Sequence, residues 1–279
     1  VRPWVQAAAA VGATVRWIDF DPGSGELTVD DVDAVLSERT RLVALTAASN
    51  LIGTRPPIGD ISRRVRETDA VFYVDGVHNS AHCLVDVEQL GCDLYVCSPY
   101  KFCGPHCGVL AGHPELLATI RPDKLLPASD DVPDRFEFGT LPYELMAGTT
   151  AAVDFLAGLV SGEGTRRERL VASLGALEAH EDVLRTHVEE GLATLPGVTV
   201  YSRAASRTPT LLFTIDGHAP EAIYEHLAGL GVNAPAGTFY AVEPANRLGI
   251  AATGGVRAGL APYTDESDVE RLLAGLRAL

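Results

Sequence analysis

The chain has 279 residues, of which 47% are hydrophobic and 21% are charged. This length and apolar content are enough to bury a large core, in one large or two modest domains. The formal net charge of −15, with no basic segment to offset it, argues against a protein that binds the phosphate backbone of nucleic acids.

The first 112 residues alternate between helix and strand patterns. The expected elements are, in order, a helix at 2–11, a strand at 14–20, a helix at 28–36 that starts with a Thr28/Asp31 capping pattern, a strand at 42–46, a helix at 58–68, and strands at 71–76, 94–98 and 108–112. Such alternation predicts an α/β fold with a mostly parallel sheet sandwiched between helices.

The pattern changes after residue 112. Residues 113–142 are rich in Pro and Asp and predict a loop that wraps over the sheet edge or reaches a partner subunit. The later expected elements are helices at 144–159 and 165–195, strands at 198–201 and 210–215, a helix at 220–230, a strand at 256–260 and a closing helix at 265–279. We therefore expect a large domain at 1–145, linking helices at 146–195 and a smaller α+β domain at 196–279, with an antiparallel sheet that has helices on one face.

Neither a membrane nor a disulfide framework is expected. No stretch approaches the roughly 20 apolar residues of a membrane span, and the first 17 residues lack the pattern of a signal peptide. The odd number of cysteines, all between Cys83 and Cys107, fits a reducing compartment, so we expect a cytoplasmic protein. Cys103 and Cys107 lack the second pair of ligands that a tetrahedral metal site needs, and no metal is expected.

Asp75 and Lys101 are the first candidates for chemistry. Each follows a short apolar run, VFYV and LYVC, and ligands of open α/β sheets bind at the carboxyl ends of such strands. A lysine attacks an aldehyde only as the neutral amine, which a confined site would favour. A carboxylate can keep a pyridine nitrogen protonated. On pattern alone, a lone lysine after a strand is more often an ordinary surface residue, and the same holds for Asp75.

Five motifs occur together in one order and nearly cover the chain. They are ASNLIGT (48–54), VDGVHNSAHCLVDVEQLGCD (74–93), CSPYKFCGPHCG (97–108), RFEFGT (135–140) and GGVRAGLAPYTDESDVERLLAGL (254–276). Together they resemble the class V aminotransferase family of fold type I pyridoxal-phosphate enzymes. Within it the chain is most similar to the cysteine-desulfurase-like subgroup. The resemblance implies pyridoxal 5'-phosphate as cofactor and a small α-amino acid as substrate.

The resemblance also implies a role for each matching residue. Lys101 would hold the cofactor covalently and later move a proton. Asp75 would pair with the pyridine nitrogen, and Arg257 would clamp the substrate carboxylate. The remaining cofactor contacts implied are His78 and Asn50 at the ring or its phenolic oxygen, Ser98 and Tyr100 at the phosphate, and Gly139 and Thr140 at the phosphate of a neighbouring subunit, which implies a homodimer.

Four of these residues have ordinary structural alternatives. His78 could be a core histidine, Asn50 a turn residue, Thr140 a helix cap and Arg257 a surface ion-pair residue. His82 and His106 lie in the same motifs and are assigned no role.

The chain departs from the family pattern in two places. No small-residue turn at a helix N-terminus, the usual phosphate site, precedes the first expected strand, so the sequence resembles a family chain without its N-terminal part. The segment 231–257, where desulfurases carry a mobile cysteine, contains none and has Tyr240 instead. A thiolate is needed to carry a persulfide.

Three functions therefore stay open. The first is a cysteine-desulfurase-like lyase or transferase. The second is a class V aminotransferase or epimerase that acts without a persulfide cysteine. The third is a catalytically silent dimeric scaffold.

Overall fold

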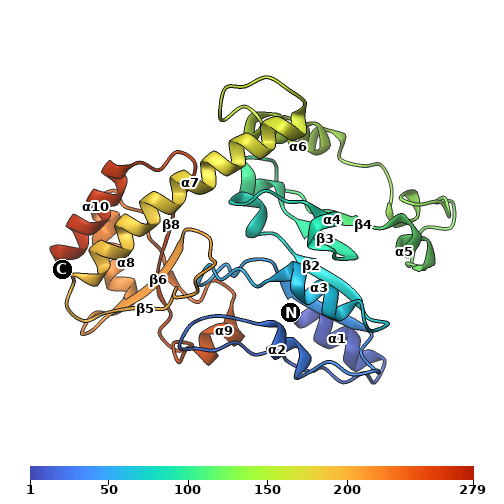
Figure 1. Cartoon of the computed structure of the whole chain (residues 1–279), viewed down its shortest axis with the longest axis horizontal. Helices are drawn as coiled ribbons and strands as arrows, with labels where there is room; N and C mark the ends of the chain where they lie inside the picture. The colour runs from blue at the N-terminus through green and yellow to red at the C-terminus, as the bar shows by residue number, and fades with distance from the viewer.

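The computed structural model describes residues 1–279 and contains two four-stranded sheets (Figure 1). The first sheet has the order β1-β2-β3-β4, with β1 at Leu42–Thr46, β2 at Val71–Asp75, β3 at Leu94–Cys97 and β4 at Val109–Gly112. Strands β1, β2 and β3 are parallel, and β4 is antiparallel to β3. The predicted mostly parallel sheet is thus confirmed.

One face of the first sheet is covered by α2 (Val29–Asp33), α3 (Ile58–Val65) and α4 (Val87–Leu90). Phe72 and Val74 of β2 pack on this side in a core that includes Ile61 and Val65 of α3. Side chains alternate along a strand, so Tyr73 faces the other side, where its ring meets the Trp4 ring of α1 (Arg2–Ala10) at 4.9 Å. Asp75 shares that face.

The second sheet has the order β5-β6-β8-β7 and is antiparallel throughout. Its strands are β5 at Val198–Val200, β6 at Thr210–Ile215, β7 at Ala236–Gly237 and β8 at Gly255–Gly259. Residues of α8 (Pro220–Gly229), α10 (Glu266–Arg277) and the end of α7 (Arg166–Ala193) join β6 and β8 in one core. The predicted antiparallel sheet with packed helices is confirmed.

Helix α7 runs diagonally across the molecule from the first sheet to the second (Figure 1). It starts with a capping box of Thr165 and Glu168 and continues for 28 residues. It is preceded by α6 (Tyr143–Leu156), and α5 (Pro114–Thr119) and a 3₁₀ turn at Asp134–Phe136 lie in the Pro- and Asp-rich segment. None of the helices is both long and apolar enough to cross a bilayer.

A third, smaller core joins the two sheets. It combines the loop after β1 with β6 and with the end of α9 (Val242–Arg247) and the residues after it; its buried members are Leu51, Ile52, Leu212, Ala245 and Ile250. The carboxyl edge of the first sheet is therefore packed against the second sheet.

The predicted strand at 14–20 is wrong. This segment forms no strand, because none of its backbone groups joins a ladder. Its alternation has a different cause: Ile18 and Phe20 pack on two cores, while Trp17 remains 51% exposed. Helix α2 also ends at Asp33 instead of Leu36, and the short elements α4, α5, α9 and β7 were not expected.

Candidate active site

Asp75 and Lys101 come from the ends of two neighbouring parallel strands. Asp75 is the last residue of β2 and is in register with Val96 of β3, and the next amide, that of Gly76, donates a 2.8 Å hydrogen bond to the Val96 carbonyl. The chain then passes Ser98 and enters the 3₁₀ turn η2 (Pro99–Phe102) that carries Lys101. The two residues are thus delivered to the same sheet edge, as their positions predict.

The turn that carries Lys101 is anchored by its buried neighbours. Phe102 is buried against Ala152 and Leu156 of α6, and Pro99 is also buried. The Lys101 amide donates to the Ser98 carbonyl at 2.9 Å, and Cys103 ends the turn in the left-handed region at φ 67°. Because its neighbours are anchored in the core, Lys101 can point outward while its backbone stays fixed.

Lys101 has a lowered pKa. Partial burial is the main cause, and the positive charge of Arg257 contributes. Its ammonium lies 5.3 Å from the centroid of the Tyr100 ring, which stacks in parallel on the His106 ring at 4.9 Å. Burial and the nearby positive charge both favour the neutral amine. This is the form that reacts with an aldehyde.

His78 lies in the loop after β2 and faces the second sheet. Its Nε2 is 3.0 Å from the Thr208 hydroxyl and 2.9 Å from the Thr210 hydroxyl. Burial, followed by the charges of His82, Arg257 and Lys101, lowers the pKa of His78 to about 3. The imidazole is therefore neutral at physiological pH.

Arg257 on β8 reaches back to the loop after β1. Its Nη1 donates to the Asn50 carbonyl at 2.7 Å, and its guanidinium lies over the Phe239 ring at 3.9 Å. The Asn50 amide in turn donates to the Phe239 carbonyl at 2.8 Å. Asn50 was expected to reach a cofactor oxygen; in this structure its amide nitrogen bonds Phe239, and its backbone orients Arg257.

The structure thus brings Asp75, His78, Lys101 and Arg257 to one edge, with Asn50 beside Arg257 and with Ser98 and Tyr100 next to Lys101. Gly139 and Thr140 are not part of this group. Both are exposed, they precede α6, and neither forms a hydrogen bond to any of the residues named above. The site of one chain therefore forms without them.

Sequence reasoning missed Thr208, Thr210, Phe239 and Glu181; the carboxylate of Glu181 lies 3.0 Å from Nδ1 of His82. The two threonines precede or begin β6, and their hydroxyls become relevant only once the second sheet packs on the first. Phe239 and Tyr240 have φ angles of 53° and 64°, in the left-handed region that non-glycine residues avoid. No motif in the sequence marks these four residues.

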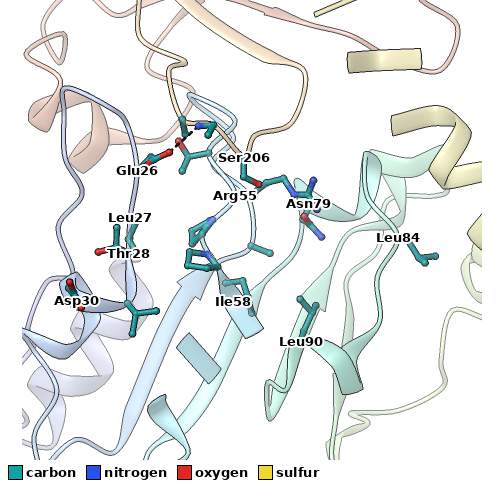
Figure 2. A pocket seen from close by; sticks show the side chains of 17 residues that line it. Glu26, Leu27, Thr28, Asp30, Arg55, Ile58, Asn79, Leu84, Leu90 and Ser206 are labelled. Carbon is teal, nitrogen blue, oxygen red and sulfur yellow. Dashed lines mark hydrogen bonds between the residues drawn. The ribbon is translucent and has the colours of Figure 1, made fainter. Parts of the chain in front are cut away.

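A cavity lies beside this group, and none of the four residues Asp75, His78, Lys101 and Arg257 lines it (Figure 2). It has a volume of about 590 Å³, and it is lined by Glu26, Arg55, Asn79, Leu90 and Ser206 among others. Figure 2 shows Arg55, Asn79, Ile58 and Leu90 among the side chains that line it. Asn79 directly follows His78, so one loop borders both the cavity and the site.

The residues present fit a pyridoxal-phosphate cofactor. Lys101 supplies an amine with a lowered pKa, and the exposed Asp75 carboxylate forms no ion pair; its only hydrogen bond is from the Val77 amide at 3.0 Å. A carboxylate left free at a strand end can receive a protonated pyridine nitrogen. The neutral imidazole of His78 lies at the same edge of the first sheet.

Comparison with known proteins supports this fit. Residues 1–272 match the family model described as aminotransferase class V. The chain is 32% identical to a cysteine desulfurase from Dickeya dadantii and 30% identical to an aminotransferase-like protein from Gibberella zeae, covering 67% and 68% of these proteins with 100% and 99% of its own length. The structure of the cysteine desulfurase CsdA from Escherichia coli matches with a TM-score of 0.77 at 27% identity, over 100% of this chain and 68% of that one.

The fold and the site define a pyridoxal-phosphate-dependent enzyme of the α/β class described above. Within that class, the chain belongs to the class V aminotransferase family.

Proposed function

We propose that the protein acts on a small α-amino acid, at its α- or β-carbon, with pyridoxal 5'-phosphate held by Lys101. The observation that carries this proposal is the meeting of Asp75, neutral His78, Lys101 and Arg257 at one edge. When bound, the cofactor supplies an electron sink for the carbanion at the substrate α-carbon.

Each residue has a proposed task. Lys101 would hold the cofactor, and its amine would move a proton at the α-carbon. Asp75 would pair with the pyridine nitrogen, and Arg257 would bind the substrate carboxylate with its planar guanidinium. His78 would orient the ring, Asn50 would exchange its hydrogen bond to Phe239 for one to the phenolic oxygen, and the hydroxyls of Ser98 and Tyr100 would bind the phosphate.

A homodimer is part of the proposal. Gly139 and Thr140 are exposed and form no hydrogen bond to the Lys101 site of their own chain, which leaves them free to serve the phosphate of a neighbouring subunit. We also propose the division into 1–145, 146–195 and 196–279, supported by the separate cores of the two sheets. A cytoplasmic location is likewise proposed, on the unpaired cysteines.

The names of the relatives favour a cysteine-desulfurase-like reaction, but Tyr240 favours a second candidate. Tyr240 is fully exposed and stands where the desulfurase pattern needs a thiol. Burial raises the pKa of Cys83 to about 12 and also raises the pKa of Cys92 and Cys97, so these thiols stay protonated. An aminotransferase or epimerase reaction needs no thiolate.

The chain allows a sharp test, because Lys101 and Lys124 are its only lysines. Purified protein is incubated with pyridoxal phosphate and reduced with borohydride, and the modified lysine is located by mass spectrometry. We expect modification of Lys101, lost in K101A and retained in K124A. Lys124 is already bound to the Ala128 carbonyl and to Asp130.

The reaction type is decided with a panel of amino acids and separate detection of sulfide, keto acid and inverted substrate. Sulfide from cysteine supports the desulfurase-like lyase. Keto acid or inversion supports the second candidate. Modification of Lys101 without any product would instead support the silent scaffold, and no modification at all would overturn the proposed function.

A further inference from the structure

Glu181 is a buried carboxylate that the proposed reaction does not use. It lies in the middle of α7, and only 1% of its surface is exposed. Its single hydrogen-bonding partner is His82, whose Nδ1 lies 3.0 and 3.2 Å from the two carboxylate oxygens. His82 is itself 9% exposed. An acid is rarely buried to this extent without a specific partner.

His82 connects this carboxylate to the site. Its ring meets the ring of His78 edge-on, with centroids 5.0 Å apart and planes at 63°. On its other side His78 is held by the hydroxyls of Thr208 and Thr210. The imidazole of His78 is thus fixed by His82, which is bonded to α7, and by two threonines at the start of β6 and just before it.

The carboxylate also controls where the proton of His82 resides. An ionised Glu181 accepts a hydrogen bond from Nδ1–H, so a proton must be present on that nitrogen. Burial raises the pKa of Glu181, and the hydrogen bond from His82 acts in the opposite direction. Removal of the carboxylate would leave Nδ1 of a buried ring without a partner and free the ring to turn.

An ion pair on the same helix provides a comparison. Glu178, one turn before Glu181, pairs with Arg55 in the loop after β1, but both side chains are substantially exposed, at 41% and 31%. This pair also joins α7 to the first sheet, yet it does not touch a ring of the site. Glu178 therefore represents a glutamate that joins α7 to the first sheet without acting on a ring of the site.

We propose that Glu181 is a positioning residue for the cofactor site, which acts through His82 to hold the imidazole of His78 in one orientation and one protonation pattern. The consequence for pyridoxal phosphate rests on the proposed function above. The effect on His78 does not, because it is a property of the chain without cofactor.

The first experiment therefore uses the cofactor-free protein. The ¹⁵N and ¹H resonances of the histidine side chains are recorded for wild type, E181Q and the control E178Q, and His78 and His82 are assigned from H78Q and H82Q. We expect E181Q to lose the Nδ1–H pattern of His82 and to shift the His78 signals, while E178Q leaves both unchanged. Unchanged His78 signals in a folded E181Q would overturn the proposal.

Substitution of Glu181 alone could prevent folding, since it leaves His82 buried and unpaired. The double variant E181L/H82F replaces both polar partners by apolar groups, which costs much less than breaking the pair. It keeps a ring against His78 but removes the carboxylate. We expect the His78 signals to move in this variant as well; wild-type signals would contradict the proposal.

The second experiment measures pyridoxal-phosphate binding by its visible absorption. We expect the dissociation constant of E181Q to rise about tenfold and the absorption maximum to shift, with E178Q equal to wild type. Equal binding by E181Q and wild type would overturn the positioning role. Failure of wild type itself to bind would count against the proposed function, and the histidine resonances would still decide whether Glu181 acts on His78 through His82.

Discussion

The guanidinium of Arg257 donates a 2.7 Å hydrogen bond to the backbone carbonyl of Asn50, which joins strand β8 of the second sheet to the loop after β1 of the first. The stack of Arg257 on Phe239 fixes the plane of the same group. A substrate carboxylate bound here would therefore meet a cation that is already oriented by both sheets.

Replacement of Arg257 by lysine should weaken substrate binding. Lysine keeps the charge but lacks the planar fork that binds a carboxylate with two hydrogen bonds. We expect KM for the amino acid to rise at least about tenfold, equivalent to about 1.4 kcal/mol, with unchanged cofactor absorption. R203K is the control, since Arg203 lies over Tyr201 at 5.9 Å in an exposed position. An unchanged KM in R257K would refute the carboxylate role.

The D75N variant should lose activity without losing stability. The Asp75 side chain is exposed and accepts one hydrogen bond, from the Val77 amide, which an asparagine oxygen can also accept. The lost negative charge would no longer favour a protonated pyridine nitrogen, and kcat should fall by roughly two orders of magnitude, or about 2.7 kcal/mol. D69N, at an exposed position before β2, serves as control. Wild-type turnover by D75N would argue against this pairing.

Burial of His78 should make the protein sensitive to mild acid. The pKa of His78 is lowered to about 3, mainly by burial, so below its ordinary value of 6.5 the unfolded chain takes up a proton that the folded chain does not. The free energy of unfolding should fall as the pH drops from about 6.5 towards 3, by up to about 1.4 kcal/mol per pH unit. Urea unfolding at several pH values measures this slope.

In the variant H78Q, the free energy of unfolding should no longer show the part of its fall between pH 6.5 and 3 that His78 causes. The variant H218Q, at an exposed residue, should keep this part. Identical slopes for H78Q and wild type would show that other groups cause the acid sensitivity.

Gly76 should tolerate no side chain. A Cβ at this position would lie 1.9 Å from the Tyr95 ring, which is 4% exposed and bonded through its hydroxyl to Ser80 at 2.9 Å. We expect G76A to lower the free energy of unfolding by about 1 to 3 kcal/mol, the range for overpacked cores, in a denaturant titration. G108A, where nothing lies within 4 Å, should differ little from wild type. Equal stability of the two variants would contradict this packing.

The sequence predicted those parts of the site that depend on one strand and the loop after it. The runs before Asp75 and Ser98 are apolar and β-prone, so both the strands and their polar ends could be located. Thr208, Phe239 and Glu181 could not be found in this way, because their importance arises from the packing of one sheet on the other. The predicted strand at 14–20 does not form, because a side-chain pattern reports burial on one side and not hydrogen bonding.

The hydrogen bond from Arg257 to Asn50 has a consequence for selectivity. A surface arginine usually loses hydration water and conformational freedom when it binds an anion, and this loss lowers the affinity. Contacts within the chain already hold Arg257 in place, so less conformational freedom is lost when a ligand binds to it. Carboxylates that approach at the wrong angle gain little from it. If Arg257 binds the substrate carboxylate as proposed, selectivity would then depend on the direction from which the carboxylate approaches and not on charge alone.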